Sequence, residues 1–132
     1  MDLQQRVNQQ FNHNIATNQG SIALLAPAIV GASDLITTAL LRGNKVMCCG
    51  AAGSGTLAQY FAATLLNRYE RERPGLPAIA MNADAQALST IANNSNYREV
   101  YAKQLRVLAQ EGDIFLALCA NGNSKNTTEA VK

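Results

Sequence analysis

The sequence is poor in the side chains that most often carry catalysis or bind metals. It has one histidine, His13, no tryptophan, and only 15% charged residues among 132. No Cys-x-x-Cys pair occurs, so a zinc site built from cysteine and histidine is not expected. The net charge is +2 and no run of Lys and Arg stands out, whereas nucleic-acid-binding proteins carry basic patches. We therefore expect no cofactor, no metal and no direct contact with nucleic acid.

Signals for export or membrane insertion are weak. The N-terminus lacks the basic segment and apolar run of a signal peptide. Residues 21–41 are apolar and nearly long enough to span a bilayer, but Pro27 and Asp34 interrupt them and the apolar positions repeat at helical spacing. An amphipathic core or interface helix explains them better. Three cysteines (Cys48, Cys49 and Cys119) without a signal peptide favour free thiols in a reducing compartment. We expect a cytoplasmic protein with no membrane contact.

The pattern of apolar residues predicts an α/β fold. Three short, continuously apolar runs bounded by turn residues are typical of strands that are covered on both faces, and helical patterns separate them. Strands separated by helices indicate a three-layer parallel sheet with helices on both faces. The expected strands are 45–49, 78–81 and 114–119, and the expected helices are 56–69, 84–91, 100–110 and one beginning at 125.

Residues 1–43 are expected to form a helical region ahead of this sheet. Leu3, Val7 and Phe11 repeat every four residues, which predicts a first amphipathic helix that Asn18-Gln19-Gly20 breaks. A second helix is expected over 24–41. Such helices favour an oligomeric bundle. We expect one domain over 1–132, truncated in its C-terminal part because the chain stops inside a short helix.

Two loops are candidates for binding an anion. Gly50–Gly55 follows the first expected strand and Asn121–Ser124 follows the third, and each opens a helix. Ligands of open α/β sheets bind at the carboxyl ends of strands, and free N–H groups at helix starts attract anions. Ser54 and Ser124 are also candidate N-caps, so ordinary strand-to-helix turns explain the loops equally well.

Several ordered motifs resemble the SIS (sugar isomerase) domains of phosphoheptose isomerases. The segment from Cys49 to Ser54 is similar to their CGNGGS, and the segment from Arg73 to Ala80 to their RPGYPAIA. Ile91–Asn94 resembles VGND, and Gly122-Asn123-Ser124 resembles the end of STSGNS. The resemblance runs in order from about Leu24 to Lys132. It is strongest for a non-enzymatic branch that associates with the bacterial replication initiator DnaA.

The resemblance implies a flavodoxin-like SIS fold and a homotetramer or homodimer. It also implies a sugar-phosphate site at Ser54, Gly53, Asn121, Ser124, Asn93 and Asp84. Asp84 is equally well explained as a helix N-cap. The family's His and Glu, one helical turn apart, correspond to Tyr60 and Thr64 here, and neither is a useful base near neutral pH. We therefore expect no inherited isomerase mechanism and no zinc.

Other residues have two explanations each. Tyr60 either lines a crevice or packs with its hydroxyl at the rim, and the cysteines are either reactive or small core residues, with the second explanation favoured in both cases. Arg68, Arg71 and Arg73 either contact phosphate or an acidic partner, or form a solvated loop. The leading hypothesis is a non-catalytic oligomeric adaptor for DnaA. The alternatives are a phosphosugar isomerase and a phosphosugar sensor.

Overall fold

The computed structural model describes residues 2–132. Residues up to Leu35 form one compact unit and Ile36–Lys132 form a second. The elements follow one another as α1 (Leu3–Leu41), β1 (Val46–Gly50), α2 (Gly53–Leu66), β2 (Ala78–Ala80), α3 (Ala85–Asn94), a 3-10 turn η1 (Tyr97–Glu99), α4 (Val100–Leu108), β3 (Ile114–Leu118) and α5 (Lys125–Val131).

The N-terminal region forms one continuous helix, α1, where two helices were expected. The expected break at Asn18-Gln19-Gly20 is absent because a single glycine lowers helix stability by only about 1 kcal/mol and removes no hydrogen bond. The hydroxyls of Thr17 and Ser21 also donate to the carbonyl oxygens one turn earlier, at 2.9 and 2.8 Å. The segment therefore remains helical.

The apolar side chains of residues 3–35 are exposed to solvent. Leu3 is 76% exposed, Phe11 68% and Ile29 61%. By length and composition α1 could cross a membrane, but apolar helices of soluble proteins and signal sequences pass the same test, so this is weak evidence. Within this N-terminal unit, these side chains therefore have no apolar partners that shield them from solvent.

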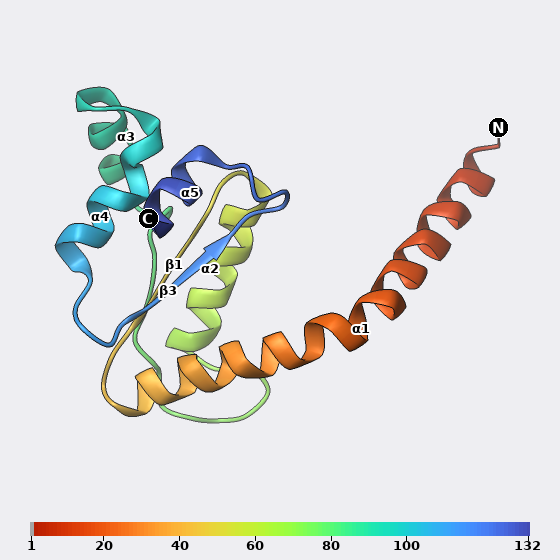
Figure 1. The fold of residues 1–132 in the computed structure, drawn as a ribbon, viewed down its shortest axis with the longest axis horizontal. Coiled ribbons are helices and arrows are strands. Elements are labelled where there is room, and N and C mark those ends of the chain that lie inside the picture. The colour runs from red at the N-terminus through yellow and green to blue at the C-terminus, as the bar shows by residue number, and fades with distance from the viewer. Residues whose placement is uncertain (1) are drawn as a thin grey trace. The chain divides into compact units, whose positions relative to one another are not determined.

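The expected parallel sheet is confirmed. Its order is β2-β1-β3, and Val46 of β1 lies opposite Ala78 of β2 and Ile114 of β3. Figure 1 shows β1 and β3 side by side, with α2 along one side of them. All five residues of β1 are buried because the strand is paired along both edges and covered on both faces. The sheet therefore positions the loop after β1 next to the loop after β3.

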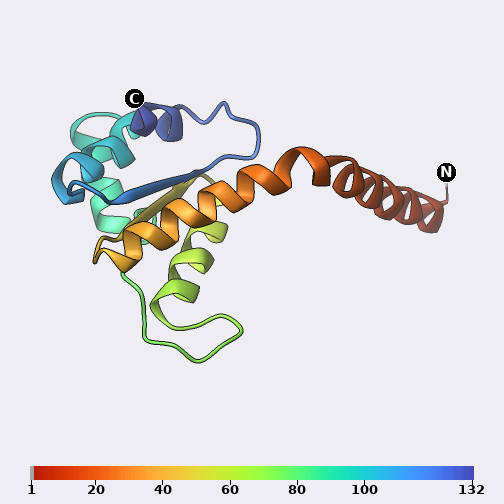
Figure 2. The ribbon, with the colours of Figure 1, turned by 60° about the horizontal axis from the view of Figure 1, so that its bottom comes forward.

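Alternate residues of β1 enter two separate cores. Val46 and Cys48 pack with α2, whereas Met47 and Cys49 pack with Tyr101 of α4. In Figure 2, α2 and α5 lie on opposite sides of the strands, as this alternation requires. Burial raises the pKa of the Cys48 thiol, and raises that of Cys49 to about 12. These two cysteines are core residues, as the sequence favoured.

Helix α2 begins and ends three residues earlier than expected, and its C-terminus is held by an arginine. It ends at Leu66 rather than Tyr69. The Arg73 guanidinium donates to the carbonyl oxygens of Thr64, at 2.8 Å, and Leu65, at 2.9 Å, near the end of the helix. Arg73 therefore satisfies carbonyls that a helix end leaves without partners, a role that neither of the two explanations from the sequence included.

Candidate functional site

The first candidate loop is tightly wrapped around two glycines. The buried Gly50 ends β1, and its carbonyl oxygen accepts a hydrogen bond of 2.7 Å from the hydroxyl of Tyr101. A Cβ atom on Gly50 would lie 2.4 Å from the backbone of Ser54. A Cβ atom on Gly55 would lie 2.8 Å from the Gly50 oxygen and 3.0 Å from the amide nitrogen of Asn82. The chain turns back on itself so closely that only glycine fits at these positions.

Ala52 is strained in this loop. It precedes α2 with φ 51° and ψ −126°, in the region that favours glycine. The resemblance to CGNGGS aligns Ala52 with a glycine of the family. Because L-residues adopt this conformation at a cost of order 1–3 kcal/mol, the loop stores backbone strain next to the candidate site.

Replacing Ala52 with glycine is expected to stabilise the protein. The strain that glycine relieves in the folded state should be larger than the free energy that its extra conformational entropy contributes to the unfolded chain. The free energy of unfolding, measured by urea denaturation, should therefore rise by about 1 kcal/mol. The matched control is Ala51→Gly, since Ala51 has no positive φ. That change should lower the free energy by about 0.5 kcal/mol. Equal losses for both variants would contradict the assignment.

Ser54 and Gly53 lie in the first turn of α2. Ser54 was expected to be the N-cap of this helix. The helix begins at Gly53, so Ser54 lies inside the first turn instead and is half-buried. The Ser54 N–H donates to the carbonyl oxygen of Ala51 at 3.1 Å. Gly53 is exposed at the start of the helix. Both residues therefore stand where an anion would meet the positive end of the α2 dipole.

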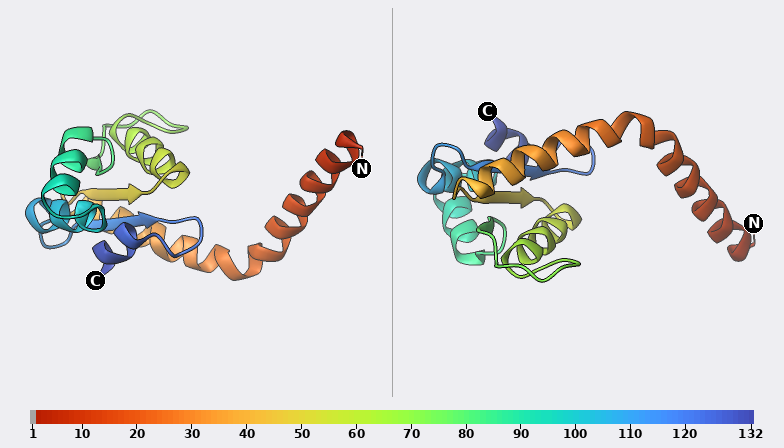
Figure 3. Two further views of the ribbon diagram at one scale, coloured as in Figure 1. Left: turned by 90° about the horizontal axis from the view of Figure 1, so that it is seen from above. Right: turned by 90° about the horizontal axis from the view of Figure 1, so that it is seen from below.

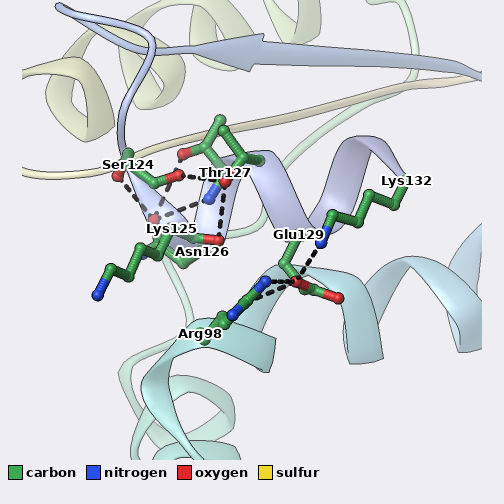
Figure 4. A network of polar contacts seen from close by, with 8 residues as sticks. Arg98, Ser124, Lys125, Asn126, Thr127, Glu129 and Lys132 are labelled. Atoms are coloured by element: carbon green, nitrogen blue, oxygen red, sulfur yellow. Dashed lines mark hydrogen bonds and ion pairs between the residues drawn. The ribbon is translucent and has the colours of Figure 1, made fainter.

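The second candidate loop satisfies much of its own polarity. The Asn121 side-chain oxygen accepts from the Asn123 N–H at 3.0 Å, and Ser124 donates its hydroxyl to the Asn126 side-chain oxygen at 2.8 Å. Figure 4 shows the contact of Ser124 with Asn126 and the buried Thr127, beside the ion pair of Arg98 and Glu129. Ser124 occupies the N-cap position of α5 but makes no capping bond with its side chain.

Cys119 lies at the start of the second loop. Backbone N–H groups of the loop, chiefly those of Ser124 and Asn121, lower the pKa of its thiol. The sulfur is half-buried and donates to the Asn121 side-chain oxygen at 3.8 Å. This loop therefore directs several N–H groups at one point, which favours negative charge there.

The fold groups only some of the six predicted ligand residues. Those of the two loops follow the adjacent parallel strands β1 and β3, and Figure 3 shows both loops at the same end of the sheet. Asp84 follows β2 and caps α3, accepting from the Ala87 N–H at 2.9 Å. Asn93 is exposed about 12 Å further along that helix. The N-cap explanation of Asp84 is thus confirmed, and α3 does not bring Asp84 and Asn93 together.

Helix α2 presents no acid–base pair to this region. Tyr60 is 62% exposed, and the Thr64 hydroxyl donates to the Phe61 carbonyl oxygen at 2.8 Å. Both line a hollow of about 550 Å³, together with Ala63, Asn67, Arg68, Tyr69 and Glu70. Within residues 2–132, no three His, Cys, Asp or Glu side chains lie close enough together to hold a metal ion.

Two residues of the site were not predicted individually. Tyr101 is 1% exposed, and burial raises the pKa of its hydroxyl to about 12, so it remains a hydrogen-bond donor to Gly50. Asn82 donates to the Gly55 carbonyl oxygen at 3.0 Å, while its own side-chain oxygen is buried with no partner in the described part of the chain. The sequence contains one signal for the contact of Tyr101 with Gly50, which is a tyrosine on the apolar face of a predicted helix. It contains none for the contact of Asn82 with Gly55.

Comparison with known proteins identifies the family. The SIS domain family matches residues 10–132. The chain belongs to this family. It is 44% identical over 128 residues to a phosphoheptose isomerase of Alteromonas mediterranea, and 45% identical over 128 residues to the DnaA initiator-associating protein DiaA of Edwardsiella ictaluri. Each alignment covers 97% of this chain and 65% of the relative, so the chain spans about two thirds of the length of these proteins.

Solved structures support the SIS fold in three dimensions. A phosphoheptose isomerase from Francisella tularensis superposes with a TM-score of 0.94 at 36% identity, covering 99% of this chain and 69% of that one. The enzyme from Neisseria gonorrhoeae gives 0.90 at 35% identity, with 98% and 67% coverage. The expected family and fold are therefore confirmed. The relative named a phosphoheptose isomerase and those named DnaA initiator-associating proteins are about equally similar in sequence.

Proposed function

We propose that this chain is a non-catalytic SIS-domain adaptor that associates with the replication initiator DnaA. The observation that carries the proposal is the pair Tyr60 and Thr64 on α2. Aldose–ketose isomerisation needs a group that moves a proton between carbons, and neither a tyrosine nor a threonine hydroxyl is a useful base near neutral pH. The DiaA relatives, at 45% identity, favour the same role.

The adaptor would act by multivalent binding in the cytoplasm. We propose that the exposed apolar side chains of residues 3–35 are covered in a homotetramer or homodimer. An oligomer that holds several initiator molecules raises their effective concentration without new contacts to DNA. Direct contact with nucleic acid or a membrane is not part of the proposal, and neither is zinc.

A phosphosugar sensor is the second candidate. The two loops favour it, since the segments that carry Ser54, Gly53, Asn121 and Ser124 follow the neighbouring strands β1 and β3. Asp84 and Asn93, the other two predicted ligand residues, lie apart on α3 and are not part of this candidate site. An isomerase is the remaining alternative, favoured by the name of the Alteromonas relative. It would require a base other than Tyr60 and Thr64.

One experiment separates these functions. The purified chain is incubated with sedoheptulose 7-phosphate, with and without zinc, while turnover and melting temperature are followed. The adaptor predicts no turnover and an unchanged melting temperature, together with capture of purified DnaA. A sensor would bind the sugar phosphate and melt at a higher temperature, through ligand linkage.

The control for ligand binding is Ser54→Ala, which removes a hydroxyl from the candidate site. A rise in melting temperature that survives this change would come from elsewhere on the protein. Turnover by the unmodified chain would overturn the proposal. So would failure to capture DnaA under conditions in which a DiaA relative captures it.

A further inference from the structure

The loop after β3 contains an asparagine followed by a glycine, Asn121-Gly122, and both residues are exposed. In such a pair the backbone nitrogen of the glycine can attack the side-chain carbonyl carbon of the asparagine. Glycine hinders this attack least, because it has no Cβ atom. Gly122 has φ 72°, and no atom beyond its chain neighbours lies within 4 Å of a Cβ built there. The approach to its nitrogen is therefore open.

The Asn121 side chain is folded over the backbone that follows it. Its oxygen accepts a hydrogen bond of 3.0 Å from the Asn123 N–H, a turn typical of asparagine. The ring that this bond closes contains both reacting atoms, the Cγ of Asn121 and the nitrogen of Gly122. The Cys119 thiol donates to the same oxygen at 3.8 Å. Two donors therefore polarise the carbonyl group under attack, and both would stabilise the negative oxygen of the tetrahedral intermediate.

Asn94 offers a contrast within the same chain. It is also exposed, at the end of α3, and the residue that follows it is Ser95. The Ser95 N–H donates to the Ile91 carbonyl oxygen at 2.9 Å. A nitrogen held in a helical hydrogen bond must break that bond before it can turn toward the preceding side chain. The Gly122 nitrogen belongs to no helix or strand of the described residues, so this restraint is missing there.

We propose that Asn121 is a site of self-modification, at which the side-chain amide converts to the carboxylate of aspartate or isoaspartate. The Gly122 nitrogen loses its proton to solvent and bonds to the Asn121 Cγ. The bond from Cγ to the side-chain nitrogen breaks, and that nitrogen leaves as ammonia with a proton from solvent. Water then opens the resulting cyclic imide at either carbonyl. Water is the only co-reactant, and the net charge of the chain falls by one from +2.

The new carboxylate changes the chemistry of its loop. Backbone N–H groups of this loop lower the pKa of the Cys119 thiol, and a negative charge beside the sulfur raises it again. Isoaspartate also adds one atom to the backbone between Asn121 and Gly122. The modification therefore converts a loop that favours negative charge into one that repels it. The proposal rests on the chemistry of the loop and is independent of DnaA binding and of sugar phosphate.

The test follows the modification in the purified protein. The chain is kept for several days at pH 8, folded in buffer and unfolded in urea, and peptide mass spectrometry measures the gain of about one dalton at each asparagine. In the folded chain Asn121 should convert at least about tenfold faster than Asn94, since Ser95 must first break its hydrogen bond. Asn121 should also convert at least as fast folded as unfolded. Protection of Asn121 by folding, as at Asn94, would overturn the proposal.

Two variants test the atoms involved. Gly122→Ala places a methyl group beside the attacking nitrogen and should slow conversion about tenfold, in buffer and in urea alike. Cys119→Ala removes one of the two donors and should slow conversion about threefold in the folded chain only. Its control is Cys119→Ser, which keeps a donor. Conversion of Gly122→Ala at the unmodified rate would overturn the proposal, and an unchanged rate for folded Cys119→Ala would overturn the role of the thiol.

A third variant tests the consequence for the loop. Asn121→Asp installs one of the two products directly. Alkylation of the Cys119 thiol by iodoacetamide should then require a higher pH than in the freshly purified protein, because the carboxylate disfavours the thiolate. Cys48 and Cys49 are buried and should react little in either chain. An unchanged pH dependence would contradict the change of charge preference assigned to the loop.

Discussion

Gly50→Ala is expected to lower the free energy of unfolding by about 3 kcal/mol or more, and to prevent stable folding if the chain is marginally stable. The new Cβ atom would lie 2.4 Å from the backbone carbon and oxygen of Ser54 and 2.8 Å from the Gly55 nitrogen. All three are backbone atoms in the first turn of α2, so no side chain can rotate away. Relief would require the loop to shift, which would also strain the hydrogen bond from Tyr101.

The matched control is Gly53→Ala, three residues along the same loop. No atom lies within 4 Å of a Cβ built there, and the residue begins α2. Alanine favours the helix over glycine by up to about 1 kcal/mol, so this variant should be as stable as the unmodified chain or more so. Circular dichroism with urea titration measures both. Similar losses for the two variants would show that the loop is loose rather than tightly wrapped.

Asp113→Asn is expected to lower the free energy of unfolding by about 2 kcal/mol near pH 7. The Asp113 side chain is 5% exposed at the start of β3, and it forms an ion pair with the Lys45 ammonium. Its carboxylate also accepts the N–H groups of Lys45, at 3.0 Å, and Gln110, at 2.8 Å. The NH₂ group of an asparagine there would face one of these two backbone N–H groups, which cannot accept a hydrogen bond. The Lys45 ammonium would also lose its charged partner.

The hydrogen bonds and the ion pair of Asp113 also predict that the protein loses stability in acid. Burial alone would raise the pKa of the Asp113 carboxyl, but the N–H groups of Lys45 and Gln110 and the Lys45 ammonium together lower it from 3.8 to about 2. Between pH 4 and pH 2 the unfolded chain therefore takes up a proton that the folded chain does not, and stability falls as the pH falls. Above pH 4 this contribution is complete.

The difference between Asp113→Asn and the unmodified chain should therefore be about 1 kcal/mol smaller at pH 3 than at pH 7. Urea denaturation at the two pH values measures it. Asp34→Asn is the control, because Asp34 is exposed on α1 and should change stability little at either pH. A difference for Asp113→Asn that does not vary between pH 7 and pH 3 would contradict the lowered pKa.

The amino-acid sequence by itself determined the family, the parallel sheet and the approximate element bounds. Continuous apolar runs and helical spacing are local patterns, and both follow from which side chains must be buried. Local sequence patterns also predicted the helix cap at Asp84 and the burial of Cys48 and Cys49. The absence of a base at Tyr60 and Thr64 is a property of the sequence alone, through its resemblance to the family.

Only the tertiary structure decided how tightly the site is built. The contact of Tyr101 with Gly50 joins residues from α4 and the end of β1, and no local pattern pairs them. Arg73 holds the end of α2 across a loop whose path the sequence does not specify. The strain at Ala52 depends on the φ angle that the wrapped loop imposes. These features depend on contacts between distant segments, whereas a sequence pattern reports only which face of each segment is buried.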